Sequence, residues 1–137
     1  MLGAFRNGAR YNLAGAFGCL YTSLELETAR AELSKYFTVL PRGGFLEAVI
    51  RVRLNRVLDL TDPRTLRGCA IQPEELTSAS YLAAQAVSLR AWQSGVEGLL
   101  APSVAAPGGR NLAVFLDNQT PGWRIELRQL EASELLG

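Results

Sequence analysis

The sequence predicts a single α+β domain in which mixed or antiparallel sheets are combined with a few helices. Three observations predict this class. The chain has 137 residues, which is the length of one ordinary domain. Most of its apolar residues fall into short, alternating, strand-like runs, and only two longer segments show helical spacing. Because we find no repeat, low-complexity segment or linker, we treat residues 1–137 as one domain.

The first two elements are a short strand over residues 19–23 and a helix from Leu24 to Phe37. Thr22 and Glu25 have the spacing of a capping box, in which each side chain satisfies a free backbone N–H of the first turn. Four apolar residues recur at intervals of three and four and predict a stripe that faces the core: Leu26, Ala29, Leu33 and Phe37. Breaks are then expected at Pro41, Gly43 and Gly44.

The middle of the chain, "FLEAVIRVRLNRVLDLTD" (45–62), alternates apolar and polar residues. This pattern predicts a strand with one solvent-facing side, or two strands if Asn55 and Arg56 form a bend. Residues 63–75 read as irregular, with room for one short helix.

The last part of the chain predicts a second helix and three more strands. The helix covers 80–95 and ends at Gly95, which suits a left-handed C-cap. Proline and glycine separate the strand candidates, which are "GLLAPS" (98–103), "NLAVFLD" (111–117) and "WRIELRQL" (123–130).

Composition excludes several kinds of function. A net charge of +1 argues against a broad nucleic-acid surface, although it allows a local basic pocket. No apolar run approaches the roughly 20 residues that span a bilayer, and the first residues lack a signal-peptide core, so we expect a cytoplasmic protein. We expect Cys19 and Cys69 to stay reduced. The absence of histidine removes the usual general base and zinc ligand, so we expect no metal site and chemistry based on carboxylates, hydroxyls, arginines and backbone.

Arg10 and Glu32 are the first candidate site residues. Arg10 lies in the glycine-containing segment "NGARYNLAGAFGCLYTS" (7–23), where it is either a structural arginine or a ligand for phosphate and ribose hydroxyls. Glu32 lies on the flank of the predicted apolar stripe, so its carboxylate is either solvated or lines a cleft. Glu27, its rival on the same helix, points outward.

Tyr21 and one loop complete the candidates. Tyr21 has the pattern of a buried strand aromatic whose hydroxyl is satisfied. The loop in "APSVAAPGGRNLAVF" (101–115) presents Ser103, Arg110 and Asn111, and is either functional or a plain connection between strands.

Taken together and in order, three runs resemble the RES domain: "GARYN…LYTSLELETARAE", "VIRVRLNRVLDLTDP" and "GVEGLLAPS…GGRNLAVF". The resemblance implies a fold similar to the ADP-ribosyltransferases and an enzyme that consumes NAD+ as substrate, with phosphate as a possible co-substrate and no prosthetic group. It also implies that this enzyme cleaves the nicotinamide–ribose bond by phosphorolysis or hydrolysis, and that it is the toxin of a toxin–antitoxin pair. A protein ADP-ribosyltransferase, or an inactive domain that binds an antitoxin, stay open as alternatives.

The resemblance also implies the site. The family's arginine, tyrosine, glutamate and serine would be Arg10, Tyr21, Glu32 and Ser103, with Tyr11 and Asn111 as further substrate-binding residues. Arg10 would hold the pyrophosphate or an incoming phosphate, and Tyr21 would stack on the nicotinamide ring. Glu32 would stabilise positive charge on the ribose, while Ser103 and Asn111 would offer hydrogen bonds.

The partner that the resemblance implies is an Xre-type helix-turn-helix antitoxin whose C-terminal segment covers the active site. Any contact with DNA would come from that antitoxin, since a near-neutral toxin lacks the charge for direct nucleic-acid binding. A homodimer within a larger toxin–antitoxin complex is compatible with the sequence.

Overall fold

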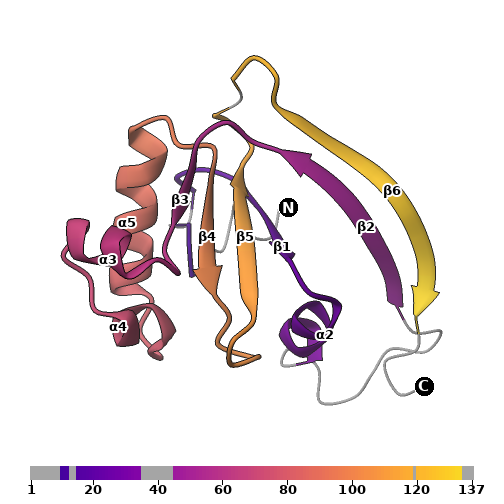
Figure 1. The fold of residues 1–137 in the computed structure, drawn as a ribbon, viewed down its shortest axis with the longest axis horizontal. Helices are drawn as coiled ribbons and strands as arrows, with labels where there is room; N and C mark the ends of the chain where they lie inside the picture. Colours follow the sequence, from indigo (N-terminus) through magenta and orange to yellow (C-terminus); the bar gives the residue numbers. More distant parts are fainter. Residues whose placement is uncertain (1–9, 13–14, 35–44, 119, 134–137) are drawn as a thin grey trace.

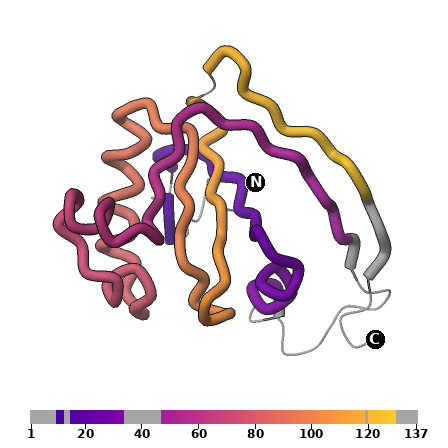
Figure 2. Tube along the Cα trace, viewed as in Figure 1, coloured from indigo at the N-terminus to yellow at the C-terminus, as the bar shows by residue number. Residues whose placement is uncertain are grey.

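A computed structural model of the chain describes residues 10–12, 15–34, 45–118 and 120–133 (Figures 1 and 2). This part of the chain confirms the α+β class. Its elements, in chain order, are β1 (Cys19–Ser23), α2 (Leu26–Ser34), β2 (Phe45–Arg53), β3 (Val57–Asp59), α3 (Pro63–Gly68), α4 (Pro73–Thr77), α5 (Leu82–Gln93), β4 (Gly98–Pro102), β5 (Arg110–Phe115) and β6 (Arg124–Ser133).

Four strands form the central sheet, in the order β1-β5-β4-β3. β5 is antiparallel to both β1 and β4, whereas β3 and β4 are parallel. Parallel neighbours need a crossover between them, and α3, α4 and α5 supply it. These three helices therefore gather beside the β3 and β4 end of the sheet (Figure 1).

The hydrophobic core lies between this sheet and the crossover helices. Phe17 is fully buried there, stacks on Trp92 of α5 with ring centroids 4.9 Å apart, and meets the edge of Phe115 of β5 at 5.1 Å. Each such aromatic pair contributes about 0.5–1.5 kcal/mol of stability beyond the contribution of the surface area that it buries. The core thus fixes β5, the strand that lies next to β1.

The strands β2 and β6 form a separate antiparallel ribbon, with an irregularity in register between Val49 and Ile50. The ribbon arcs away from the central sheet (Figures 1 and 2). At its base, the carboxylate of buried Glu97 accepts the backbone N–H groups of Asn55 and Arg56, at 2.7 and 2.9 Å. The Asn55 amide also donates to the segment before β6, at Thr120 Oγ1 and the Pro121 carbonyl.

Most predicted elements are confirmed. The strand at 19–23 and the three later strands are present, and the chain bends at Asn55 and Arg56 between β2 and β3. Gly95 follows α5 with a φ of 83°, as its predicted C-cap role requires. Arg51 and Arg53 are exposed, which confirms the solvent-facing side of β2. Cys19 and Cys69 are free thiols.

Residues 63–75 contain two short helices where the sequence predicted one. Asp62 caps α3, since its side chain accepts the Arg64 backbone N–H. Gln72 and Glu75 form a capping box at the start of α4. Each helix begins at a proline, whose fixed φ suits the first helical position.

The predicted start of the first helix is wrong. α2 begins at Leu26, and Thr22 belongs to β1, where its hydroxyl donates to the Leu112 carbonyl. The carboxylate of Glu25 accepts the Thr28 hydroxyl instead of closing a capping box with Thr22. Strand pairing with β5 therefore takes precedence over the local capping pattern.

The predicted core-facing stripe is also wrong. Leu26 is 49% exposed and Ala29 is exposed, whereas Thr28 on the opposite flank is buried. The stripe faces a cavity rather than the core, as described below. The remaining residues of these predictions, Phe37, Pro41, Gly43 and Gly44, lie outside the described part of the chain.

Candidate active site

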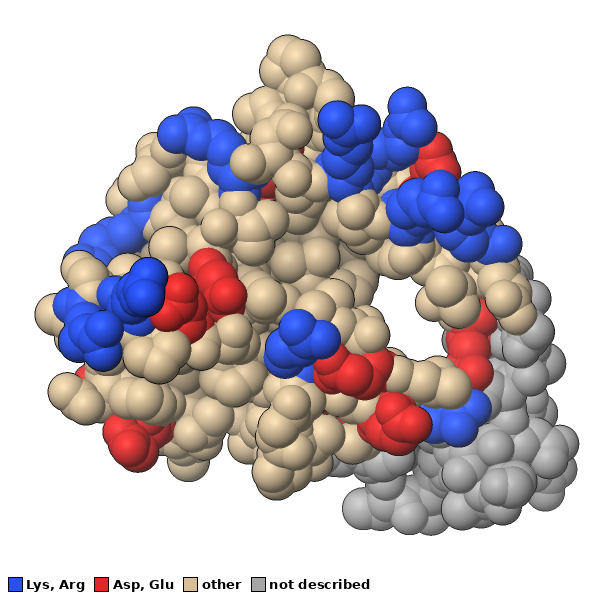
Figure 3. All heavy atoms as spheres, viewed as in Figure 1, with Lys and Arg blue, Asp and Glu red and all other residues tan. Residues whose placement is uncertain are grey.

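A cavity of about 1190 Å³ lies between the central sheet, α2 and the ribbon. It exceeds the roughly 300–1,000 Å³ of typical small-molecule sites, and the space-filling view shows an opening between the ribbon and the body of the protein (Figure 3). The apolar stripe of α2 lines it through Leu26, Ala29 and Leu33. The exposed apolar face of α2 is therefore one wall of a cavity.

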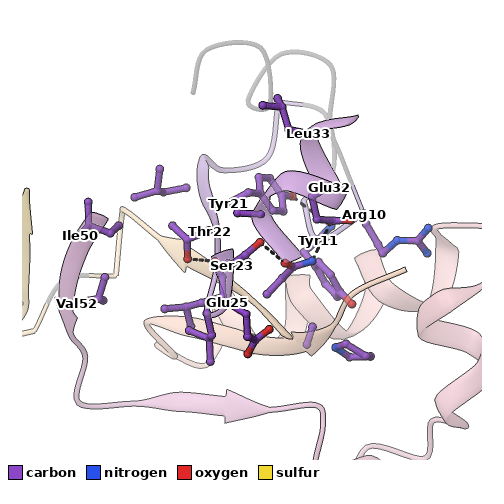
Figure 4. A pocket seen from close by; sticks show the side chains of 18 of the residues that line it. Arg10, Tyr11, Tyr21, Thr22, Ser23, Glu25, Glu32, Leu33, Ile50 and Val52 are labelled. Atoms are coloured by element: carbon purple, nitrogen blue, oxygen red, sulfur yellow. Dashed lines mark hydrogen bonds between the residues drawn. The ribbon is translucent and has the colours of Figure 1, made fainter. Parts of the chain in front are cut away.

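Five of the six predicted site residues line this one cavity: Arg10, Tyr11, Tyr21, Glu32 and Asn111 (Figure 4 labels the first four). They come from the segment before β1, from β1 itself, from α2 and from β5. Arg10 and Glu32 were predicted to meet around one ligand, and they do share a hollow. Glu27 is exposed and absent from the cavity wall, which agrees with the choice of Glu32 over Glu27.

Glu32 is half-buried and is held by β5. Its Oε2 accepts a hydrogen bond from Asn111 Nδ2 at 3.0 Å. Asn111 Oδ1 in turn accepts the Ser23 hydroxyl at 2.6 Å. Ser23 and Asn111 are direct partners in the β1–β5 register, so strand pairing places the two side chains together.

A second carboxylate of the cavity, Glu25, is engaged differently. Its Oε1 accepts the Arg110 backbone N–H at 2.8 Å, and its Oε2 accepts Arg110 Nε at 3.0 Å. These hydrogen bonds, together with one from the Thr28 hydroxyl, lower the pKa of Glu25 below its usual value. Glu25 therefore remains ionised at neutral pH and ties the start of α2 to β5.

Arg10 makes structural contacts, and it also lies where it could bind an anionic ligand, so both of its expected roles remain compatible with the structure. Its Nη1 donates to the carbonyls of Leu76 and Ser78, at 3.0 and 2.8 Å, and its guanidinium lies 4.4 Å from the centre of the Tyr81 ring. Within the described residues, no carboxylate pairs with it. A charged group held in place in this way, on the wall of the cavity, is suited to meet an anion.

The two tyrosines are linked through the turn that carries Arg10. The Tyr21 hydroxyl donates to Asn12 Oδ1 and accepts the Tyr11 backbone N–H at 3.3 Å. Tyr21 is 38% exposed, so it is not the buried strand aromatic that its pattern suggested, whereas its hydroxyl does have hydrogen-bond partners, as that pattern also suggested. Burial of that hydroxyl raises the pKa of Tyr21.

Tyr11 is almost fully buried in the wall of the cavity. Burial raises the pKa of Tyr11 to about 12, with smaller effects from the nearby charges of Arg10, which lowers it, and Glu32, which raises it. Its hydroxyl is therefore protonated at neutral pH, and it has no hydrogen-bond partner among the described residues. A buried hydroxyl without a partner is costly, which fits a position where a ligand supplies the partner.

Ser103 is the predicted site residue that the structure does not bring into the cavity wall. It is buried, and its Oγ accepts the Ala106 backbone N–H at 3.1 Å within the loop between β4 and β5. Its neighbours Pro102 and Val104 do line the cavity. The predicted contact of Ser103 with substrate stays a prediction, while its observed bond orders the loop.

Sequence reasoning missed three residues of this site: Ser23, Asn12 and Tyr81. A period of two from Tyr21 could have placed Ser23 on the same side of β1, but its pairing with Asn111 depends on strand register. Asn12 acts through a hydrogen bond from Tyr21 across the turn before β1, and Tyr81 acts through a contact with Arg10 that joins distant parts of the chain. No signal in the sequence reports those contacts.

Neither a metal centre nor a membrane span emerges from the described ranges. No group of three or more acidic, histidine or cysteine side chains there could hold a metal ion. Among the helices placed by the structure, none is both long and apolar enough to cross a membrane.

Comparison with known proteins places this geometry in a family. Residues 1–132 match the model of the RES domain. The chain is 35% identical over 133 residues to a probable NAD(+) phosphorylase of Mycobacterium tuberculosis, and the match covers 90% of this chain but only 62% of that relative. The crystal structure of the M. tuberculosis MbcT–MbcA toxin–antitoxin complex contains a chain with a similar fold, at a TM-score of 0.78 and 21% identity, over 98% of this chain and 76% of that one.

Proposed function

The chain belongs to the RES domain family, and from that premise we propose that it cleaves the nicotinamide–ribose bond of NAD+. The observation that carries the proposal is the meeting of Arg10, Glu32 and Tyr11 in one cavity, although α2 and the N-terminal turn are separate in the chain. The name of the relative from M. tuberculosis, a probable NAD(+) phosphorylase, supports the same reaction.

The reaction needs few catalytic groups. The bond between ribose C1 and the pyridinium nitrogen breaks with its electron pair going to nicotinamide, which leaves as a neutral molecule. Positive charge develops on the ribose, and an oxygen of phosphate or water forms the new bond at C1; when water is the acceptor, it releases a proton to the solvent. No general acid is required for this leaving group, so a site without histidine can carry out the reaction.

The residues of the cavity supply what the reaction does need. The carboxylate of Glu32 would stabilise the developing charge on the ribose and accept a ribose hydroxyl. Arg10 would bind the pyrophosphate or the attacking phosphate, and the Tyr11 hydroxyl would gain the hydrogen-bond partner that the described residues do not supply. The exposed part of the Tyr21 ring would stack on nicotinamide.

We further propose that the protein acts in the cytoplasm as the toxin of a toxin–antitoxin pair. The similar fold of a chain in the toxin–antitoxin complex from M. tuberculosis supports this assignment. An Xre-type antitoxin that covers the cavity would keep NAD+ out until it is removed.

Incubation of the purified, antitoxin-free protein with NAD+ tests the reaction. We expect free nicotinamide, measured by chromatography, and its release should depend on phosphate if the acceptor is phosphate. Release that is independent of phosphate identifies water as the acceptor. Label retained on a protein from ³²P-NAD+ identifies a protein ADP-ribosyltransferase. No nicotinamide in any arm rejects the proposed reaction and leaves the inactive, antitoxin-binding domain.

A further inference from the structure

Three side chains of the cavity wall form a directed chain of hydrogen bonds. Ser23 Oγ donates to Asn111 Oδ1 at 2.6 Å, and Asn111 Nδ2 donates to Glu32 Oε2 at 3.0 Å (Figure 4). All three residues line the cavity. Neither the family resemblance nor the candidate motifs of the sequence assigned a role to Ser23.

The direction of the chain follows from the chemistry of its members. An ionised carboxylate only accepts hydrogen bonds, so the nitrogen of the Asn111 amide must face Glu32. The amide oxygen then faces Ser23, whose hydroxyl must donate. A flipped amide would place its oxygen against the carboxylate of Glu32, which is repulsive. The carboxylate of Glu32 therefore selects the amide orientation, and the Ser23 hydroxyl, by donating to the amide oxygen, helps to hold Asn111 in that orientation.

Backbone pairing between β1 and β5 holds the Ser23 and Asn111 side chains next to each other. Ser23 and Asn111 are opposite each other in the β1–β5 pairing, and the next residue, Leu24, donates its N–H to the Arg110 carbonyl at 3.0 Å. Opposed residues in a sheet have Cβ atoms only about 4.5–5.5 Å apart, so the two side chains meet without a strained rotamer. Strand pairing thus links the position of Ser23 to α2, the helix that carries Glu32.

We propose that Ser23 is a positioning residue for Glu32 and acts through the amide of Asn111. This inference rests on the proposed cleavage of NAD+, in which Glu32 faces the ribose. Ser23 itself needs no contact with the substrate. Its hydroxyl fixes the carboxylate at the place where positive charge develops, so its removal acts on the rate of the chemical step more than on substrate binding.

Steady-state kinetics of NAD+ cleavage give the first test. In Ser23→Ala we expect kcat to fall about tenfold, the size of one lost hydrogen bond of about 1.4 kcal/mol, with KM changed by less than about twofold. Ser23→Thr keeps the hydroxyl and suits a strand, so it should recover kcat to within about threefold. Ser94→Ala removes a hydroxyl that bonds the Arg90 carbonyl outside the cavity and should leave both constants unchanged.

A double-mutant cycle separates action through Asn111 from direct action on the substrate. In an Asn111→Ala background, the further change Ser23→Ala should lower kcat by less than about twofold, because the path to Glu32 is already broken. A full tenfold loss in that background would overturn the inference. So would a Ser23→Ala variant with wild-type kcat.

The side-chain amide of Asn111 provides a readout that does not depend on turnover. In ¹⁵N-edited NMR spectra of the free protein, we expect its resonance to shift and its protons to exchange faster with water in Ser23→Ala than in wild type or Ser94→Ala. An unchanged resonance would contradict the inference even if the enzyme is active. If wild type releases no nicotinamide, the proposed function fails, and this resonance still decides whether Ser23 orients the amide.

Discussion

The central sheet and the β2–β6 ribbon contribute to the same cavity in different ways. The part built on the sheet and α2 supplies charged and polar side chains, among them Arg10, Tyr11 and Glu32. The ribbon supplies apolar ones: Ala48, Val49, Ile50, Val52 and Ile125. Four arginines of the ribbon are exposed and do not line the cavity: Arg51, Arg53, Arg124 and Arg128. Figure 3 shows basic side chains gathered on the outer part of the ribbon.

This difference indicates that the sheet and α2 carry the reactive groups, whereas the ribbon encloses the substrate. Groups that act on a reacting bond must be held rigidly, and the sheet has a packed aromatic core behind it for that purpose. The ribbon pairs mainly with itself and forms an apolar wall of the cavity rather than a platform for catalysis. Changes in the body should therefore alter rate or stability, and changes on the inner face of the ribbon should alter binding.

The largest expected effect comes from the carboxylate on the body side. Glu32→Gln should lower the rate of nicotinamide release by at least about 100-fold, because an amide cannot stabilise positive charge on the ribose. The fold, followed by circular dichroism, should be unchanged because the side chain is only half-buried. Glu27→Gln, on the exposed side of the same helix, is the matched control. Loss of activity in the control with retention in Glu32→Gln would assign the catalytic role to the other face of α2.

The next largest effect is expected on stability, from a change in the packing between the β4–β5 loop and α2. A Cβ at Gly109 would lie 2.3 Å from Thr28 Oγ1 and 2.9 Å from the Ala106 carbonyl, so Gly109→Ala should separate the β4–β5 loop from α2. We expect a loss of about 2 kcal/mol in the free energy of unfolding, measured in urea. Gly68→Ala is the control, because a Cβ there meets nothing within 4 Å. If both variants are equally stable, the loop can move to accommodate the added Cβ with no loss in the free energy of unfolding.

A smaller effect is expected from the inner face of the ribbon. Val52→Thr keeps the shape of the side chain and adds a hydroxyl to the apolar wall, so KM for NAD+ should rise about fivefold while kcat stays the same. The neighbouring change Arg53→Ala, on the exposed side, should leave KM unchanged. If Val52→Thr instead lowers kcat alone, the ribbon takes part in the chemical step and the division between the two regions is wrong.

The smallest effect is expected where the two regions touch. Arg30 of α2 and Glu47 of β2 form a salt bridge of 2.7 Å, with side chains 46% and 23% exposed. Exposed ion pairs contribute little to stability, so the two single alanine variants and the double variant should differ from wild type by less than about 2 °C in the thermal midpoint. The difference should shrink further in 1 M salt. A large coupling would mean that this contact holds the ribbon in place.

The sequence alone predicted those parts of the fold that depend on local pattern. Alternation located β1 and the later strands, and Gly95 marked the end of α5 because the turn there needs a positive φ. The sequence pattern correctly identified the apolar stripe of α2, but it did not show that the stripe faces a cavity instead of the core. A periodic pattern shows which face of a helix is apolar, yet the same pattern suits a core and a cavity wall.

The candidate site was predictable to a similar extent. Four residues were candidates from their setting in the sequence, and the family resemblance gave them roles and added Tyr11. All five line one cavity: Arg10, Tyr11, Tyr21, Glu32 and Asn111. Ser23 escaped because its importance comes from pairing with Asn111 across the β1–β5 register. Ser103 was predicted from the same resemblance, but its hydroxyl accepts a loop N–H instead of reaching the cavity. Long-range register and loop conformation are properties of the folded chain that local spacing does not encode.

The buried carboxylate of Glu97 governs the direction in which the chain leaves the sheet. It accepts two backbone N–H groups at the bend before β3, and the Asn55 side chain joins that bend to the segment before β6. These hydrogen bonds anchor the ribbon at its base, and the salt bridge between Arg30 and Glu47 is a second contact farther along β2. Lengthening or shortening both strands beyond this anchor in step would make the pocket deeper or shallower without tilting its wall.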